Sequence, residues 1–269
     1  MAERILVVTA ESVTQLQGVA GQVLVAGSHG GVIAAYFGAR AGVHAMILND
    51  AGVGKDRAGI AGLFYLEDIG MAAAAVDCMS ARIGDGADML ARGVISHVNA
   101  FAALRGVVSG QSCVDAAERL RAAPQPRSGP PPYAEGRWCV DSGPPEVWAI
   151  DSVGKVEPGD AGRILVIGSH GALHGGRPGS ALGVDAAAVV FNDAGLGADR
   201  IGITRLLVLA ARGIPAAAVD CMSARIGDGR SAWETGVISH ANSVAVALGA
   251  VRGMAVPRFA ALIAAQNRR

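Results

Sequence analysis

The chain of 269 residues has little of what marks several common classes of protein. Its formal net charge at neutral pH is zero, so there is no electrostatic reason to expect binding to nucleic acid or to an anionic membrane surface. No apolar run approaches the roughly 20 residues that a membrane-spanning helix needs. The N-terminal segment MAERILVVTAES lacks the apolar core and cleavage site of a signal peptide. We therefore expect a cytoplasmic protein with neither nucleic-acid nor membrane partners.

Cysteines and aromatic residues are also scarce. The four cysteines form no C-x-x-C pair and no zinc-type spacing, so neither a disulfide framework nor a cysteine-rich zinc site is expected. Aromatic residues make up 4% of the chain, whereas hydrophobic residues as a whole make up 51%. Small apolar side chains and 38 glycines must then build the core, which favours close packing of helices on sheets.

Several catalytic signatures are missing as well. The chain has no G-x-S-x-G elbow and no H-E-x-x-H zinc motif. Neither G-x-G-x-x-G nor the P-loop pattern follows a strand-like run, which argues against a standard dinucleotide or P-loop site. Any activity must therefore depend on another arrangement of residues.

What the sequence does contain is an internal repeat. Residues 73–86 read AAAVDCMSARIGDG, and residues 216–229 repeat these letters without change. The segments Gly-Ser-His-Gly, Asn-Asp-Ala-Gly and Gly-Val-Ile-Ser-His also recur in the same order. The sequence between them has diverged, since residues 32–37 (VIAAYF) correspond to the unrelated residues 173–177 (LHGGR). Polar segments that stay alike while their surroundings change indicate a chemical constraint, and hence a functional site.

A proline-rich segment separates the two copies. Residues 122–145 hold seven of the eleven prolines, which is typical of a partly extended linker. We predict a first repeat over residues 1–121, this linker, and a second repeat over residues 146–269. The linker is long enough for the two modules to pack about a pseudo-two-fold axis as a homodimer would. Further assembly into a homo-oligomer is left open.

Each copy alternates strand-like and helix-like segments. Short apolar runs predict strands at Ile5–Thr9, Val23–Ala26, Ala45–Leu48 and Ala72–Val76, and again at Val147–Ile150, Ile164–Ile167, Ala187–Phe191 and Ala216–Val219. Helices are expected at Arg57–Ile69, Ala87–Arg105, Arg200–Arg212 and Ser231–Val251. Fully apolar strands are typical of parallel sheets covered on both faces. The predicted fold class is therefore α/β, an internal duplication of a three-layer module with a mainly parallel sheet.

The repeated polar segments each follow a predicted strand. Carboxyl ends of parallel strands share one edge of a sheet, where ligands bind in such folds, so we expect these residues to converge. The candidate catalytic residues are His29, Asp50, Asp77, Ser80, His170, Asp193, Asp220 and Ser223. The candidate substrate-binding residues are Ser28, Gly30, Asn49, Arg82, Ser169, Gly171, Asn192 and Arg225.

The chemistry of these residue types indicates their roles. A histidine titrates near neutrality, so His29 suits a general base, and Asp50 or Asp77 would orient it. Ser80 or a bound water would be the nucleophile, and the Arg82 guanidinium would anchor an anionic group. The alternative for each residue is a purely structural role in a loop or turn, such as a histidine bonded to a backbone carbonyl or an Asn-Asp turn.

Other residues of the repeated segments have similar alternatives. Cys78 is either a nucleophile or a small buried hydrophobic residue, and Arg82 is either a ligand anchor or an ion-pair partner of Asp77 or Asp85. Asp85 is expected to cap a helix rather than to take part in catalysis.

Two further pairs of residues are interpreted as structural. His97 and His240 are predicted to lie on the apolar face of a helix, where they would contact the site residues without touching the ligand. Asp56 and Asp199 stand just before predicted helices and are expected to be N-caps.

Three functions are compatible with this sequence. The first is a hydrolase that cleaves an amide or ester bond in a small polar substrate, with no cofactor. The second is a hydrolase or lyase in which His29, Asp50 and Asp77 hold a divalent metal such as zinc, manganese or iron. The third is a non-catalytic protein that binds a small ligand. Each module has its own site, or both contribute to shared sites, and the sequence leaves the two arrangements open.

The segment Ser28-His29-Gly30 resembles part of the caspase-like peptidase fold, in which one strand ends in His-Gly. The next strand of that fold ends in a short turn that carries a cysteine nucleophile. Here the corresponding Asn49–Gly52 has no cysteine. The resemblance therefore bears on topology and not on peptidase activity.

Overall fold

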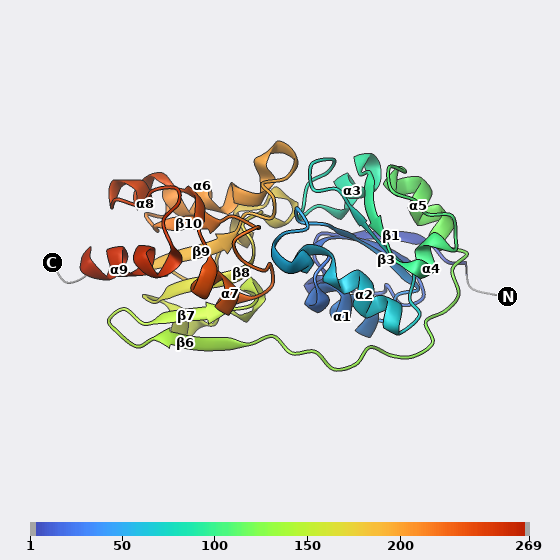
Figure 1. Ribbon diagram of the computed structural model, residues 1–269, viewed down its shortest axis with the longest axis horizontal. Coiled ribbons are helices and arrows are strands. Elements are labelled where there is room, and N and C mark those ends of the chain that lie inside the picture. The colour runs from blue at the N-terminus through green and yellow to red at the C-terminus, as the bar shows by residue number, and fades with distance from the viewer. Residues whose placement is uncertain (1–3, 267–269) are drawn as a thin grey trace. The chain divides into compact units, whose positions relative to one another are not determined.

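The computed structural model describes residues 4–266 and divides the chain into two compact units (Figure 1). Unit 1 is formed by the chain up to Val53, by Arg57–Ala134 and by Gly197–Asp199. Unit 2 is formed by Gly54–Asp56, by Glu135–Leu196 and by the chain from Arg200 onward. Each unit contains one mostly parallel sheet with helices on both faces. The α/β fold class and the duplication predicted from the repeat are confirmed.

The sheet of unit 1 has five strands in the order β1-β2-β3-β4-β5. These are β1 (Val7–Ala10), β2 (Val23–His29), β3 (Ala45–Asn49), β4 (Ala73–Val76) and β5 (Ile95–Val98). The first four run parallel, and β5 is antiparallel to β4. Because these four strands are parallel, their carboxyl ends all lie at the same edge of the sheet.

The sheet of unit 2 has six strands in the order β11-β10-β9-β8-β7-β6. These are β6 (Arg137–Asp141), β7 (Val147–Ile150), β8 (Ile164–His170), β9 (Ala188–Asn192), β10 (Ala216–Val219) and β11 (Ile238–Ala241). The four central strands are parallel, and the two edge strands are antiparallel to their neighbours. The edge strand β6 lies inside the segment predicted to be a linker, where it pairs with β7.

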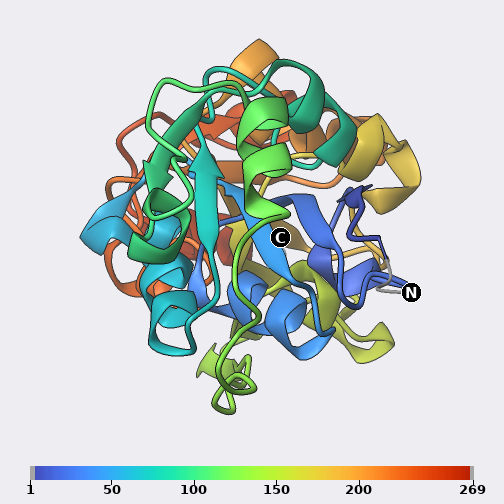
Figure 2. The same ribbon diagram turned by 90° about the vertical axis from the view of Figure 1, so that its right-hand side faces the viewer.

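Side chains alternate between the two faces of the sheet in unit 1, as buried strands require. Leu24 faces one layer of helices and Val25 faces the other. The first layer consists of α1 (Val32–Arg40) and α2 (Ala61–Asp68). The second consists of α3 (Gly86–Arg92), α4 (Ala100–Ala103) and α5 (Cys113–Leu120). Figure 2 shows the sheet of unit 1 between these layers.

Unit 2 has the same three layers with one difference. One face of its sheet packs against α6 (Thr204–Ala211). The other packs against α7 (Gly229–Thr235), α8 (Ser243–Ala247) and α9 (Val256–Gln266). In place of a counterpart of α1, the chain after β8 forms two short 3-10 turns, His174–Gly176 and Pro178–Ser180. Of the helices that the structure describes, none is long and apolar enough to span a bilayer.

A buried arginine explains how unit 2 fills the space of the missing helix. Gly62 and Arg205 occupy corresponding positions, since their backbone N–H groups donate to the corresponding carbonyls after β2 and β8. In unit 1 a Cβ atom at Gly62 would lie 2.7 Å from the Cβ of Ala35, so only glycine lets α1 pack there. In unit 2 the fully buried Arg205 side chain donates to the carbonyls of Ala172 and Ser180.

The predicted helix Ala87–Arg105 is wrong, and so is its counterpart Ser231–Val251. Each is a short helix, a strand and a second short helix: α3, β5 and α4 in unit 1, and α7, β11 and α8 in unit 2. α3 ends at Gly93, where the backbone becomes extended with ψ of 144°, and a Cβ atom there would lie 2.3 Å from the carbonyl oxygen of Met89. His97 and His240 therefore lie on edge strands and not on an apolar helix face.

The prediction that Asp56 and Asp199 are helix N-caps is also wrong. Both residues lie inside 3-10 turns, residues 55–60 and 198–203, with φ of 54° and 56°. The helices α2 and α6 begin only after these turns, so neither aspartate is placed to accept from the first turn of a helix.

Candidate functional site

The repeated polar segments lie at the carboxyl edge of the sheet in each unit. In unit 1, β2 ends at His29, β3 ends at Asn49, and Asp77 follows β4 directly. His29 is the register partner of Asn49. The ends of β3 and β4 are joined because the backbone N–H of Cys78 donates to Asp50 Oδ1 at 3.0 Å.

Asn49 and Asp50 form a turn in which both side chains accept from nearby backbone. Asn49 Oδ1 accepts from the N–H of Ala51 at 2.9 Å, and Asp50 Oδ1 accepts from the N–H of Gly52 at 3.0 Å. Both residues are buried. The turn interpretation of the Asn-Asp pair therefore describes the local structure, and it places the Asp50 carboxylate between two strand ends.

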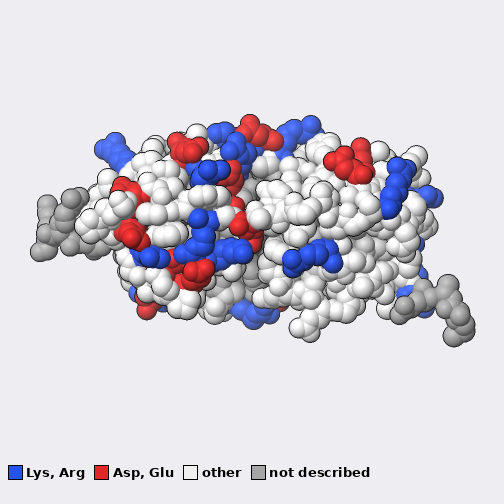
Figure 3. Space-filling model, turned by 90° about the horizontal axis from the view of Figure 1, so that it is seen from below, with Lys and Arg blue, Asp and Glu red and all other residues white. Residues whose placement is uncertain are grey.

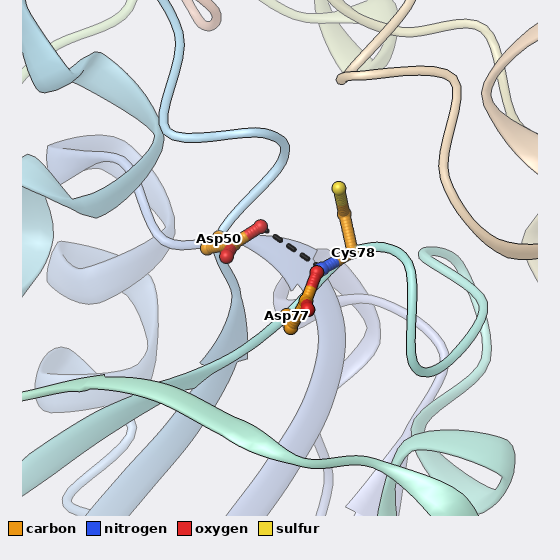
Figure 4. A group of neighbouring side chains, drawn as sticks. All are labelled: Asp50, Asp77 and Cys78. Carbon is orange, nitrogen blue, oxygen red and sulfur yellow. Dashed lines mark hydrogen bonds between the residues drawn. The ribbon is translucent and has the colours of Figure 1, made fainter. Parts of the chain in front are cut away.

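A group of possible metal ligands surrounds this carboxylate. The donor atoms of Asp50, Asp77 and Cys78 lie within 4.8 Å of one another. Figure 4 shows Asp50, at the end of β3, facing the turn after β4 that carries the other two residues. Unit 2 repeats the group with Asp193, Asp220 and Cys221. Within residues 4–266, His29 belongs to no such group, so the ligand set predicted from the sequence is replaced by one that contains a thiol.

The electrostatics of the group oppose a thiolate. Burial raises the pKa of the Cys78 thiol, and the nearby carboxylates of Asp50 and Asp77 raise it further. In unit 2, burial raises the pKa of Asp193, although the Ser239 hydroxyl and the backbone N–H of Cys221 donate hydrogen bonds that oppose this shift. The nucleophilic form of a cysteine is the thiolate, so the protein alone does not activate Cys78.

Ser80 connects the turn after β4 to the neighbouring strand. Its hydroxyl donates to the carbonyl of Asp77 at 2.7 Å and accepts from the N–H of Val94 at 2.9 Å. Ser223 makes the same two bonds, with the carbonyl of Asp220 and the N–H of Val237. Both serines thus have a structural role, in which each hydroxyl links the turn to the neighbouring edge strand.

The rest of the repeated segment crosses the end of β2 in close contact with its backbone. Gly84 donates its N–H to the carbonyl of Gly27 at 2.7 Å, and a Cβ atom at Gly27 would lie 2.4 Å from the nitrogen of Asp85. Asp85 caps α3 by accepting from the N–H of Asp88, as predicted. Much of the identity between the two copies therefore has a packing cause.

Arg82 and Arg225 pair with carboxylates of their own units. The guanidinium of Arg82 binds Asp199 at 2.8 Å and lies 3.9 Å from Asp88. Arg225 binds Asp228 at 2.9 Å, and Asp228 is the counterpart of Asp85. The pairing predicted for Arg82, with Asp77 or Asp85, is wrong in unit 1, whereas in unit 2 Asp228 both caps α7 and pairs with Arg225. Both guanidinium groups are nearly half exposed.

His29 and His170 are held by backbone N–H groups. Nδ1 of His29 accepts from the N–H of Gly31 at 3.1 Å, and Nδ1 of His170 accepts from the N–H of Ala172 at 3.3 Å. Burial lowers the pKa of His29 to about 4. The ring is therefore neutral at pH 7, and its backbone partner is a donor rather than the carbonyl considered from the sequence.

The small residues beside these histidines serve the fold. The hydroxyl of Ser28 accepts from the N–H of Val13, and that of Ser169 accepts from the N–H of Val153. A Cβ atom at Gly30 would lie 2.5 Å from the carbonyl oxygen of Gly59. Gly171 and Asn192 repeat the environments of their unit 1 counterparts, against the carbonyl of Gly202 and the N–H of Ala194.

The edge-strand histidines stand beside the site. The ring Nδ1 of His97 lies 3.1 Å from the hydroxyl of Ser96, and His240 repeats this contact with Ser239. Burial and the positive charge of Arg200 lower the pKa of His240, while the charge of Asp193 opposes the shift. His240 is the register partner of Ala218 on β10, the strand that Asp220 follows directly.

The sequence analysis missed two residues found only in unit 2. The ring of His174 packs edge-on against that of His170 with centroids 5.7 Å apart, and Nη2 of Arg205 lies 3.4 Å from Nε2 of His174. Burial and the charges of Arg205 and Arg177 lower the pKa of His174 to about 4. An arginine inside the apolar helical run ITRLLVLA was the signal that could have revealed this arrangement.

Comparison with known proteins identifies no relative of this chain. No protein-family model, no curated protein and no solved structure matches this chain. The resemblance of the His-Gly segment to caspase-like peptidases therefore has no counterpart in an overall match. Function has to be inferred from the site itself.

Proposed function

We propose that the protein is a metal-dependent hydrolase of small polar molecules, with one divalent-metal site in each unit. The observation that carries this proposal is the group formed by Asp50, Asp77 and Cys78, whose donor atoms lie within 4.8 Å of one another. The same group recurs in unit 2 as Asp193, Asp220 and Cys221. Both groups lie at the carboxyl edge of a parallel sheet, where ligands bind in α/β folds.

The chemistry of the donor set fits a divalent ion. Two carboxylates and a thiolate are ligands for zinc, iron or manganese. The environment that raises the pKa of the Cys78 thiol is one of burial and negative charge, and a cation would compensate both. When bound, such an ion would lower the pKa of a coordinated water and polarise a carbonyl oxygen.

The backbone orients both carboxylates. The N–H groups of Gly52 and Cys78 donate to Oδ1 of Asp50, and the N–H of Met79 donates to Oδ1 of Asp77. All three of these bonds are made to Oδ1, so none of these backbone donors engages Oδ2 of either carboxylate. Fixing one oxygen while the other binds the ion is how surrounding hydrogen bonds orient ligands in metal sites.

The proposal assigns the nucleophile to water. The hydroxyl of Ser80 is already engaged with the Asp77 carbonyl and the Val94 N–H, and the Cys78 thiol is held in its neutral form. A water molecule activated at the acidic group would be the nucleophile, so neither Ser80 nor Cys78 has to take that role.

Metal content tests the proposal directly. The full chain, purified without chelators and supplied with zinc, manganese and iron, is expected to retain two ions, one for each acidic group. Asp50→Asn keeps an Oδ1 acceptor for the two backbone N–H groups but removes the charge, so it should leave one ion. Asp50→Asn combined with Asp193→Asn should leave none. Asp68→Asn, at an exposed position of α2, is the matched control and should retain both. Failure of the wild-type chain to retain any stoichiometric metal would overturn the proposal.

Activity is the second readout. A panel of small esters, amides and carboxylated analogues is assayed with the metal-loaded chain. Turnover should disappear on chelation, return on adding the metal, and disappear in the double Asp→Asn variant. Turnover that persists in the double variant contradicts a metal-dependent reaction.

A non-catalytic ligand-binding protein is the second candidate. One observation favours it: Ser80, Arg82 and Asp85 all have structural partners within their unit, so their repetition does not require catalysis. Metal retention without turnover of any panel compound, together with saturable binding of one of them, would favour this candidate.

A further inference from the structure

The hydrogen bond at Nδ1 determines where the proton of His29 resides. A neutral imidazole carries one proton, so a nitrogen that accepts a hydrogen bond leaves the proton on the other nitrogen. Nδ1 of His29 accepts from the N–H of Gly31 at 3.1 Å. His170 accepts in the same way from the N–H of Ala172 at 3.3 Å. Both rings therefore carry their proton on Nε2.

The position of Gly31 makes this arrangement firm. Gly31 is the N-cap of α1, and a Cβ atom there would lie 2.7 Å from Nδ1 of His29. The backbone N–H of Gly31 thus lies directly against the ring, and in unit 2 the N–H of Ala172, a residue with a side chain, makes the corresponding bond at a slightly longer 3.3 Å. A doubly protonated ring would point a second donor at the Gly31 N–H, which the fixed backbone cannot avoid.

The other nitrogen of His29, Nε2, has no hydrogen-bond partner in the described part of the chain. The residue as a whole is 6% exposed. The fully buried side-chain atoms that lack a partner in the same part of the chain are the two ring nitrogens of His44. Nε2 of His29 is therefore not completely enclosed, on a side chain that is otherwise buried at the edge that carries the acidic group.

From this geometry we infer that His29 is a neutral hydrogen-bond donor that binds an acceptor oxygen of the ligand through Nε2–H, and not a proton acceptor or a metal ligand. The lone pair that a base or a ligand would need is on Nδ1, and the Gly31 N–H occupies it. This agrees with the separation of His29 from the three-residue acidic group.

The ligand class follows from the donor. A neutral N–H in an enclosed position recognises a carbonyl, carboxylate or phosphate oxygen, and it stabilises negative charge that develops there. The catalytic part of the inference rests on the proposed hydrolase, in which His29 would donate to the oxygen of the bond being cleaved. The location of the proton does not depend on that proposal.

Nitrogen NMR of the full chain labelled with [15N]histidine tests the proton location. Long-range proton–nitrogen correlations distinguish the two neutral tautomers, and His29→Gln identifies the signals of His29 by their loss. The Nε2–H tautomer is expected at pH 7 with and without metal. Observation of the Nδ1–H tautomer, or of a protonated ring at pH 7, overturns the inference and leaves the metal proposal untouched.

A pair of substitutions tests the role. The side-chain amide of glutamine can present an N–H near the position of Nε2 but cannot act as a base, whereas alanine does neither. His29→Ala is expected to lower kcat/KM by about 100-fold, and His29→Gln by less than about tenfold. Equal losses in two variants whose melting curves match the wild type would overturn the donor role. If the chain shows no turnover, the affinities of the two variants for a carboxylate compound of the panel are compared instead. Equal losses of affinity in the two variants would also overturn the donor role.

Discussion

The two units differ most just after two corresponding strands, β2 in unit 1 and β8 in unit 2. Unit 1 continues from β2 into α1, whereas unit 2 continues from β8 into two short turns and fills the space with Arg205. The two units nevertheless make the same hydrogen bonds at the Asn-Asp turn after the next strand. They also make the same bonds at Ser80 and Ser223, in the turn after the strand beyond it. A covering helix can thus be replaced without disturbing the carboxyl edge. The two copies have therefore kept the polar segments at the strand ends alike, whereas the covering helix α1 has no counterpart in unit 2.

The units differ a second time at the opposite edge strand. β1 ends the sheet of unit 1, whereas β7 of unit 2 is covered by β6. β6 is tied down by Asp160, which is fully buried and binds Arg137 at 2.8 Å and Arg163 at 2.9 Å. On the face shown in Figure 3, charged side chains of both signs are interspersed. At this edge, unit 2 therefore adds a strand that is held by ion pairs, and β1 of unit 1 has no such strand beside it.

The largest effect is expected from Arg205→Ala in unit 2. The change leaves the carbonyls of Ala172 and Ser180 without their donor and opens a cavity, so it should cost about 4 kcal/mol. Urea unfolding of the full chain measures the loss. Arg252→Ala, at an exposed position, should change the stability by less than about 0.5 kcal/mol. A similarly small effect at Arg205 would mean that the turns of unit 2 do not depend on it.

Acidification should destabilise unit 1 through His29. Burial lowers the folded pKa to about 4 from 6.5, so the unfolded state binds more protons between these pH values. Stability is present above pH 6.5 and is lost as the pH falls toward 4, by about 3 kcal/mol at most. Thermal unfolding of the wild type and of His29→Gln between pH 7 and pH 4 measures this term. The stability of His29→Gln should fall less steeply with decreasing pH than that of the wild type. An identical pH dependence of stability in the two proteins would contradict the burial of the ring.

Gly86→Ala and Gly229→Ala should have equal effects, since the two glycines pack against corresponding strands, β1 in unit 1 and β7 in unit 2. A Cβ atom would lie 2.4 Å from the carbonyl oxygen of Ala10 in unit 1 and 2.4 Å from the nitrogen of Ile150 in unit 2. Each substitution should cost about 2 kcal/mol in urea unfolding. Gly159→Ala, with nothing within 4 Å, is the control. A clear difference between the first two would show that the repeated segments do not pack alike.

The smallest effect is expected from Asp160→Asn in unit 2. Burial alone would raise the pKa of Asp160, but the Glu157 N–H and the guanidinium groups of Arg137 and Arg163 outweigh it and lower the pKa. This carboxylate therefore stabilises the fold above its unfolded pKa, and the contribution is lost as the pH falls through the folded value. The variant should lose about 1.5 kcal/mol at pH 7 and less at pH 3. An unchanged loss at both pH values would show that charge is not what holds β6.

Much of the fold could be predicted because its signals are local. Apolar runs flanked by polar turns located β2, β3, β4 and their counterparts to within a few residues, and the repeat revealed the duplication. The helix predicted over Ala87–Arg105 failed because one pattern of apolar residues fits both a helix and a helix–strand–helix unit. Its strand, β5, is stabilised by pairing with β4, which no local pattern reports.

The site was predictable in position but not in chemistry. Strand ends indicated that Asp50 and Asp77 would lie at one edge, because parallel strands place their carboxyl ends together. The exclusion of His29 from the acidic group, and the addition of Cys78 to it, depend on side-chain directions that periodicity does not encode.

By itself, the sequence determined the α/β class, the two copies and the polar strand ends, since these follow from hydrophobic spacing and repetition along one dimension. Only the tertiary structure decided which nitrogen of His29 carries the proton, which carboxylates hold Arg82, and how Arg205 replaces a helix. Each of these depends on a backbone group or charge brought close by folding, and hydrogen bonds and ion pairs act only over such short distances.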